Sequence, residues 1–167
     1  ITGIHIASYG KDFKNEYKLI DLLEEINKIE GIRRIRLGSI EPILITDEFI
    51  SRLVKLEKIC HHFHLSLQSG CDETLKRMNR RYNTEEFMKV VKILIKAYED
   101  VILTTDIIVG FPNETEEEFN ETYQFIKKCE FNMLHVFPFS AREGTAAYEM
   151  KGQIDPQIKN LRAHTLL

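Results

Sequence analysis

The sequence predicts an α/β fold in which parallel strands alternate with covering helices. Five short apolar stretches recur at intervals of roughly 30 to 40 residues, which is the repeat of a βα unit. Between them lie segments with apolar residues at helical spacing. Five such units imply a parallel sheet covered by helices, with right-handed crossovers. The pattern fits a partial or full (β/α) barrel and also an open doubly wound sheet. The strand centres are Ile4, Ile35, Leu65, Ile107 and Val136.

The first part of the chain predicts three strands separated by helices. Residues 1–8 alternate β-branched side chains and are expected to form a strand. Residues 17–29 carry an apolar helical face, and Gly31 ends that helix. A short strand is expected over residues 33–37. Thr46 can cap a helix that reaches about Lys58, and a strand follows over residues 63–67.

The second part continues the alternation. Asp72 is expected to cap a short helix, and Thr84 opens a longer one through Ala97. Asp155 and Pro156 start a last helix, with proline at its first position. The remaining predicted elements are strand 101–109, helix 116–128 and strand 133–137.

Residues 104–115, Thr-Thr-Asp-Ile-Ile-Val-Gly-Phe-Pro-Asn-Glu-Thr, are the most informative stretch. Gly110 allows a sharp turn or the close approach of a ligand. Pro112 fixes its own φ and keeps the preceding residue out of helical geometry. Thr115 and Glu118 form a capping box, so a helix begins there. The unit is a strand, a tight turn and a helix, and it fits either an ordinary scaffold turn or a ligand site at the strand's carboxyl end.

Small, polar or turn-forming residues follow every predicted strand, as expected for a pocket that binds a polar ligand. Glu41 also fits a solvated loop, and the residues after the third strand also fit a simple turn. Asp106 lies within an apolar strand, so it should face the pocket or accept hydrogen bonds. His135 is expected in the core or lining the pocket. The strand-end segments are 8–10, 39–42, 68–70, 110–112 and 138–145.

Composition excludes several functional classes. The net charge of −3 does not favour nucleic-acid binding by the bulk of the domain. Three widely spaced cysteines form neither a disulfide framework nor a metal motif, which favours a reducing, cytoplasmic setting. No segment approaches the roughly 18 apolar residues of a membrane span. His62 and His64 share a strand face only with each other, so no metal site is expected there. The start at Ile1 suggests a fragment.

Five motifs occur in a fixed order along the chain. They are Arg-Leu-Gly-Ser-Ile-Glu-Pro (36–42), His-Leu-Ser-Leu-Gln-Ser-Gly (64–70), Leu-Lys-Arg-Met-Asn-Arg-Arg-Tyr (75–82), Asp-Ile-Ile-Val-Gly-Phe-Pro-Asn-Glu-Thr (106–115) and His-Val-Phe-Pro-Phe-Ser-Ala-Arg-Glu-Gly-Thr (135–145). Together they resemble the radical S-adenosylmethionine (SAM) methylthiotransferase family. The form Ser-Ile-Glu-Pro and the opening residues 2–10 are most similar to the tRNA threonylcarbamoyladenosine branch. Two positions depart from the usual pattern: Asn113 stands where glycine is common, and Cys71 where serine is common.

The resemblance implies a partial (β/α) barrel of the radical SAM type, with five of its six parallel strands in this chain. Residues 1–167 would then be a radical SAM core fragment, and the first strand and the C-x-x-x-C-x-x-C cluster loop would lie upstream. The threonylcarbamoyladenosine branch of the family adds a methylthio group to C2 of N6-threonylcarbamoyladenosine beside the anticodon, using SAM and 4Fe-4S clusters. Its partners are tRNA, bound through other domains, and an electron donor. Without cluster ligands, this chain alone is expected to be inactive.

By the same resemblance, the strand-end residues position SAM, and none is catalytic or a metal ligand. Grouped by the part of SAM they should meet, they are Gly3 for the amino group, Ser39 and Glu41 for the methionine or ribose, Gln68 and Ser69 for the ribose and cluster side, Arg80 for the carboxylate, Val109, Gly110 and Phe111 for adenine, and Phe137 for closing that side.

Other interpretations stay open on the sequence. Within the family, the substrate could be a ribosomal protein or isopentenyladenosine in tRNA. Outside it, the chain could be an unrelated (β/α)-barrel ligand-binding domain that holds phosphate through Arg142 and Gly144. A non-catalytic binding module would keep the same scaffold.

Overall fold

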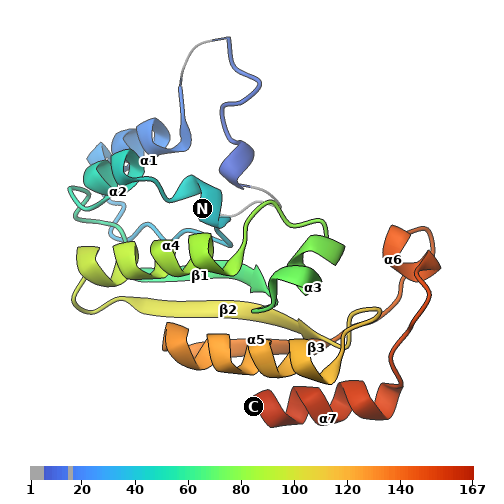
Figure 1. The fold of residues 1–167 in the computed structure, drawn as a ribbon. Helices are drawn as coiled ribbons and strands as arrows, with labels where there is room; N and C mark the ends of the chain where they lie inside the picture. Colours follow the sequence, from blue (N-terminus) through green and yellow to red (C-terminus); the bar gives the residue numbers. More distant parts are fainter. Residues whose placement is uncertain (1–5, 15–16) are drawn as a thin grey trace. The chain divides into compact units, whose positions relative to one another are not determined.

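The computed structural model describes residues 6–14 and 17–167. Strands β1, β2 and β3 are parallel and form one sheet in that order, as the arrowheads in Figure 1 show. The predicted α/β class is therefore confirmed. The elements are η1 (Ile6–Ser8), α1 (Leu19–Lys28), η2 (Pro42–Leu44), α2 (Asp47–Leu53), β1 (His62–Gln68), α3 (Asp72–Arg77), α4 (Thr84–Ala97), β2 (Ile102–Val109), α5 (Glu116–Cys129), β3 (Met133–Pro138), α6 (Ala146–Glu149) and α7 (Pro156–Leu166).

The chain divides into two compact units. The first contains residues 1–66 and 88–104, and the second contains residues 67–87 and 105–167. In the first unit α1 packs beside α2, where Arg52 forms ion pairs with Asp21 at 2.5 Å and Glu24 at 2.7 Å. The alternation along β1 buries Phe63 and Leu65 completely.

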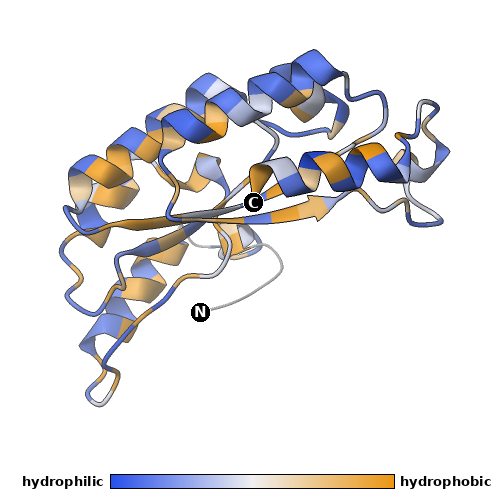
Figure 2. Cartoon of the chain, turned by 90° about the horizontal axis from the view of Figure 1, so that it is seen from below, coloured by the Kyte–Doolittle hydropathy of each residue, from blue (hydrophilic) through white to orange (hydrophobic). Residues whose placement is uncertain are grey.

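The core of the second unit is an aromatic cluster around Phe87, which is fully buried. Its ring centroid lies 6.1 Å from Tyr82, 6.3 Å from Phe125 and 6.2 Å from Phe131. Figure 2 shows the helices with one hydrophilic and one hydrophobic side, the pattern that buries one face of each helix. At the end of this unit, α7 packs against β3.

The sheet has one closed face and one more open face, and this difference places the site. Along β2, Ile107 and Val109 are buried while Asp106 and Ile108 are half-buried. Along β3, His135 is exposed, and so are the residues two positions before and after it. Side chains alternate along a strand, so the polar positions of β2 and β3 share the open face.

The first two predicted strands differ from the structure. Residues 1–5 lie outside the described residues, and Ile6–Ser8 forms a 3₁₀ turn in which the Tyr9 N–H bonds the Ile6 carbonyl at 3.1 Å. Residues 33–37 do not form a full strand. Ile35 makes one parallel bridge to Ile59, and Ile40 makes another to Leu65 of β1, so this part of the chain pairs only through isolated bridges and not through a continuous ladder.

Three local predictions need correction. Asp72 does not cap α3 but is its first residue, and its carboxylate accepts a hydrogen bond from the Thr84 N–H at 2.8 Å. Helix α2 ends at Leu53 rather than near Lys58, because a series of tighter turns follows. The short helix α6 was not expected. By contrast, the Thr46 and Asp155 caps are confirmed: their side chains accept from the amides of Phe49 and Gln157.

Candidate functional site

The turn after β2 has the geometry predicted for residues 104–115. Gly110 lies at φ +71° and Asn113 at φ +62°, so both residues adopt the left-handed region. Asparagine tolerates this region better than most residues, which explains how the turn accommodates Asn113. The capping box is present, because the Glu118 N–H donates to Thr115 Oγ1 at 3.2 Å and the Thr115 N–H donates to Glu118 Oε2 at 3.0 Å.

The end of β1 is held from two sides. Gln68 has φ +70°, which is uncommon for a residue with a side chain. The Tyr82 hydroxyl donates to the Leu67 carbonyl at 3.0 Å. Ser69 is 1% exposed, and its hydroxyl bonds Thr122 Oγ1 at 3.1 Å. Ser69 therefore anchors the turn to α5 in this structure, and its predicted contact with SAM stays a prediction.

The arginines after β1 have different environments. Arg77 forms a bidentate pair with Glu118, with N–O distances of 2.8 and 2.5 Å, so its guanidinium is committed to the start of α5. Arg80 is exposed, and no polar partner is seen for its side chain within residues 6–14 and 17–167. Of these two, Arg80 is the one whose charge remains available to a ligand carboxylate.

The Arg77–Glu118 pair predicts a pH dependence of stability. The hydrogen bonds from Arg77 hold the pKa of Glu118 below its ordinary value of 4.5. A lowered folded-state pKa gives stability that is present above 4.5 and is lost as the pH falls below it. We expect Glu118→Gln to lower the free energy of unfolding at pH 7 by about 1.5–3 kcal/mol. It should also flatten the loss of stability below pH 4.5, as measured by urea denaturation.

Arg77→Met should flatten the same acid limb, since it removes the partner that lowers the pKa of Glu118. An unchanged acid limb in both variants would contradict the assignment. Glu114 works in the opposite direction, because burial raises its pKa and its ionisation opposes folding. The contribution of Glu118 is therefore the difference between the variant and the unsubstituted chain in the stability that each loses at acid pH.

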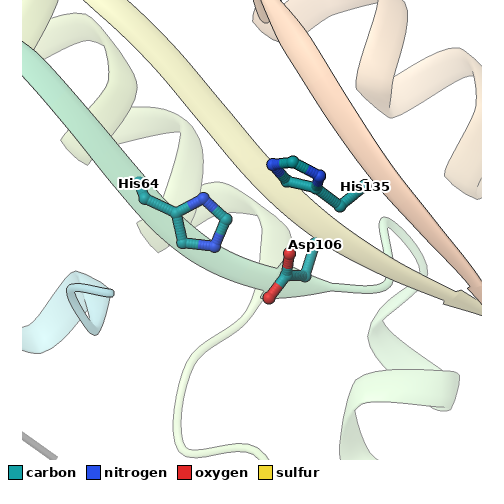
Figure 3. A group of neighbouring side chains, drawn as sticks. All are labelled: His64, Asp106 and His135. Carbon is teal, nitrogen blue, oxygen red and sulfur yellow. The ribbon is translucent and has the colours of Figure 1, made fainter. Parts of the chain in front are cut away.

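The sequence patterns did not predict that two side chains lie close together on the open face of the second unit. Asp106 on β2 and His135 on β3 present a carboxylate oxygen and a ring nitrogen within 4.8 Å of each other (Figure 3). The sequence analysis considered a pocket-facing position for each residue separately, and the structure places both on the open face. His64, also labelled in Figure 3, belongs to the first unit, where its Nδ1 bonds Thr104 Oγ1 at 2.9 Å.

The remaining predicted residues fall at strand ends or outside the described part. Ser39 is exposed and Glu41 is half-buried directly before η2, both in the first unit. Gly3 lies outside the described residues. Phe137 is 52% exposed on the open face of β3. Phe111 is buried against Phe139, with ring centroids 5.1 Å apart, and its predicted contact with adenine stays a prediction.

The turn after β2 uses some of its backbone polar groups internally and leaves one peptide group available to other partners. The Gly110 N–H and the Phe111 carbonyl are used within the turn, bonding Glu114 Oε1 and the Glu114 N–H, each at 2.9 Å. Among the described residues, the Gly110 carbonyl and the Phe111 N–H form no hydrogen bond with the protein. The two groups belong to one trans peptide and point in opposite directions, so either of them could bond a polar ligand on its own side of the turn.

The parallel strands and the helices between them define a class of protein: an α/β domain, in which ligand sites commonly lie at the carboxyl ends of the strands. Comparison with known families assigns it further. The Radical SAM superfamily matches residues 3–126, which is most of the chain. The chain belongs to the Radical SAM superfamily.

Two groups of relatives carry the comparison. The chain is 49% identical to the threonylcarbamoyladenosine tRNA methylthiotransferase MtaB of Bacillus subtilis, across all of this chain and 37% of that protein. It is 41% identical to the tRNA-2-methylthio-N(6)-dimethylallyladenosine synthase of Caldicellulosiruptor saccharolyticus, across all of this chain and 36% of that protein. The chain therefore spans little more than a third of the relatives it matches.

Solved structures support the fold. Coproporphyrinogen III oxidase of Escherichia coli, a radical SAM enzyme, aligns with a TM-score of 0.65 at 20% identity, over 79% of this chain and 30% of the oxidase. The archaeal Elp3 of Methanocaldococcus infernus aligns with a TM-score of 0.63 at 20% identity, over 80% of this chain and 32% of Elp3. Within the described residues, no helix is both long and apolar enough to cross a bilayer.

Proposed function

We propose that this chain is the SAM-positioning core of a radical SAM methylthiotransferase that acts on N6-threonylcarbamoyladenosine in tRNA. The observation that carries the proposal is the 49% identity over the whole chain to an enzyme named for that nucleoside. Two relatives named for dimethylallyladenosine are each 41% identical. The iron–sulfur clusters and an electron donor would be supplied outside these residues, because the spacing C-x-x-x-C-x-x-C is absent from the sequence.

Different residues at the strand ends would contact different parts of SAM. The Gly110–Phe111 peptide would hold adenine through the one of its two polar groups that faces the ligand, while Val109 anchors the turn by accepting from the Phe139 N–H at 2.8 Å. Phe137 would cover the adenine from the open face of β3. Gln68 and Arg80 would face the ribose and the carboxylate, with Ser69 fixing the backbone between them. Bound SAM would supply the radical chemistry of the reaction, with the electron coming from a cluster held outside these residues.

The contacts of Ser39 and Glu41 with the methionine or ribose part, and of Gly3 with the amino group, stay predictions of the family resemblance. On the open face of the second unit, the half-buried Asp106 and exposed His135 would offer a carboxylate oxygen and a ring nitrogen to a polar substrate group. The threonylcarbamoyl group carries a carboxylate and a hydroxyl that such side chains can bind, whereas a dimethylallyl group has neither.

The test is nucleoside mass spectrometry of tRNA treated with the protein that contains this chain. We expect the methylthio product on N6-threonylcarbamoyladenosine. A product on dimethylallyladenosine instead would overturn the substrate assignment, and modification of a ribosomal protein would overturn tRNA as the partner.

Arg80→Met provides the residue-level prediction. It removes the cation proposed to pair with the SAM carboxylate, so we expect at least about a tenfold loss of SAM affinity in equilibrium dialysis. Arg81→Met is the matched control, since Arg81 is also exposed and adjacent in sequence. Equal losses in the two variants would argue for a general charge effect and against a specific role for Arg80.

A further inference from the structure

The turn at residues 110–114 is held in shape by a carboxylate that lies inside it. Glu114 is 5% exposed, and its Oε1 accepts a hydrogen bond from the Gly110 N–H at 2.9 Å. The Glu114 N–H closes the turn onto the Phe111 carbonyl at 2.9 Å. The orientation of the Gly110–Phe111 peptide therefore depends on where the Glu114 carboxylate is held.

Arg162 of α7 holds that carboxylate. Its Nη1 donates to Glu114 Oε1 at 2.7 Å and to the Glu114 carbonyl at 3.2 Å. Its Nη2 reaches Glu116 Oε2 at 3.1 Å, and the guanidinium lies 5.3 Å from the centre of the Phe119 ring. The side chains of Arg162 and Glu114 are only 7% and 4% exposed, so both charges of this pair are withdrawn from water.

A buried ion pair is weak evidence for stability, because desolvation offsets most of the attraction. The direction of the Glu114 pKa agrees: burial raises it, although Gly110 and Arg162 act to lower it. A charged pair kept at such a cost points to a role in fixing geometry. The pair also joins segments 48 residues apart in sequence, and Arg162 lies beyond residue 126, where the superfamily match ends.

Further contacts from the same end of the chain hold the turn. The Lys159 ammonium donates to the Phe139 carbonyl at 2.9 Å, and its aliphatic stem packs against Gly110 so closely that a Cβ at position 110 would collide with it. On the other side, the Asn113 N–H donates to the Gly152 carbonyl at 2.8 Å, and its side chain donates to the Lys151 carbonyl at 2.9 Å. The turn is thus clamped by residues 151–162.

We propose that Arg162 is a positioning residue for the adenine side of the cofactor site, acting through Glu114 on the Gly110–Phe111 peptide. This inference rests on the proposed function, in which that peptide meets adenine. Helix α7 is then more than a cover for β3: it determines whether the turn presents its carbonyl and N–H in a binding-competent orientation.

The test compares three variants by amide exchange and by ligand binding, both followed by NMR. Arg162→Met removes the guanidinium that holds the Glu114 carboxylate. Arg162→Lys keeps the positive charge but not the guanidinium. Glu116→Gln removes only the partner that is 75% exposed and serves as the matched control. The amide of Gly70, which bonds Thr122 Oγ1 at 3.1 Å, is an internal reference within the same unit. The ligand is 5′-methylthioadenosine, which carries the adenosine part of SAM without its amino acid.

We expect Arg162→Met to accelerate exchange of the Gly110 amide by about tenfold relative to Gly70, and to weaken 5′-methylthioadenosine binding by about tenfold. Glu116→Gln should change both by less than about twofold, and Arg162→Lys should restore part of both losses. Unchanged exchange and affinity in Arg162→Met would overturn the proposal. If Arg162→Met does not fold, Arg162→Lys is the deciding variant. Amide exchange and ligand affinity in Arg162→Lys equal to those of the unsubstituted chain would then overturn the proposal.

The two proposals fail in different ways. If the unsubstituted chain does not bind 5′-methylthioadenosine, the adenine site of the proposed function is wrong, and so is the role of Arg162 toward it. If the unsubstituted chain binds and Arg162→Met binds equally well, only the positioning role is wrong.

Discussion

Replacing Gly70 by alanine should lower the free energy of unfolding by about 3 kcal/mol, a cost typical of overpacking a tight site. A Cβ at this position would lie 2.8 Å from Phe125 Cβ and 2.9 Å from Thr122 Cα. Both atoms belong to or adjoin the backbone of α5, so the helix itself would have to move. The shift would also break the bond from the Gly70 N–H to Thr122 Oγ1. Urea denaturation measures the loss.

Gly144→Ala is the control for this prediction. Gly144 has φ +81° and nothing within 4 Å of an added Cβ, so alanine there meets backbone strain without a clash. That strain costs about 1–2 kcal/mol. Phe125→Leu should not rescue Gly70→Ala, since leucine keeps the Cβ that clashes. Equal losses in Gly70→Ala and Gly144→Ala, or a rescue by Phe125→Leu, would show that the contact with α5 is not the cause.

Phe87→Ala should lower the free energy of unfolding by about 3–5 kcal/mol. Phe87 is fully buried at the centre of the aromatic cluster, so its removal leaves a cavity bounded by Phe125 and Phe131. It also removes the ring that packs beside Tyr82, whose hydroxyl supports the Leu67 carbonyl at the end of β1. We therefore expect the end of β1 to lose amide protection in hydrogen exchange.

Ile95→Ala is the matched control on the same helix. Ile95 is 47% exposed, so its truncation should change stability by no more than about 0.5–1 kcal/mol. Alanine also favours helix more than isoleucine does. Comparable losses at the two positions would show that burial in the aromatic cluster is not the cause of the Phe87→Ala loss.

The elements predicted best are those with local signals. The capping box at Thr115, the proline at the first position of α7 and the positive φ of Gly110 depend on chemistry within a few residues. The prediction of a strand at residues 33–37 is wrong for the opposite reason. Its isoleucine pattern suits a strand, but a strand needs partners over its whole length, and Ile35 finds only the bridge to Ile59.

The candidate site divides in the same way. The strand-end positions Gln68 and Gly110 were recognisable because turn chemistry and motif order are written in sequence. The burial of Ser69 and the orientation of the Phe111 ring were not, because each depends on a neighbour from another element, Thr122 and Phe139 respectively. The ten proposed cofactor contacts therefore remain a hypothesis whose backbone members are the best supported.

The sequence by itself determined the α/β class, most helix boundaries and the turn after β2, since these follow from periodicity, caps and residues with restricted φ. Only the tertiary structure decided what holds that turn. No local pattern connects Arg162 to Glu114, 48 residues earlier, or brings Asp106 beside His135. Burial removes water as a partner, so a charged group must find its counterpart wherever the fold places one.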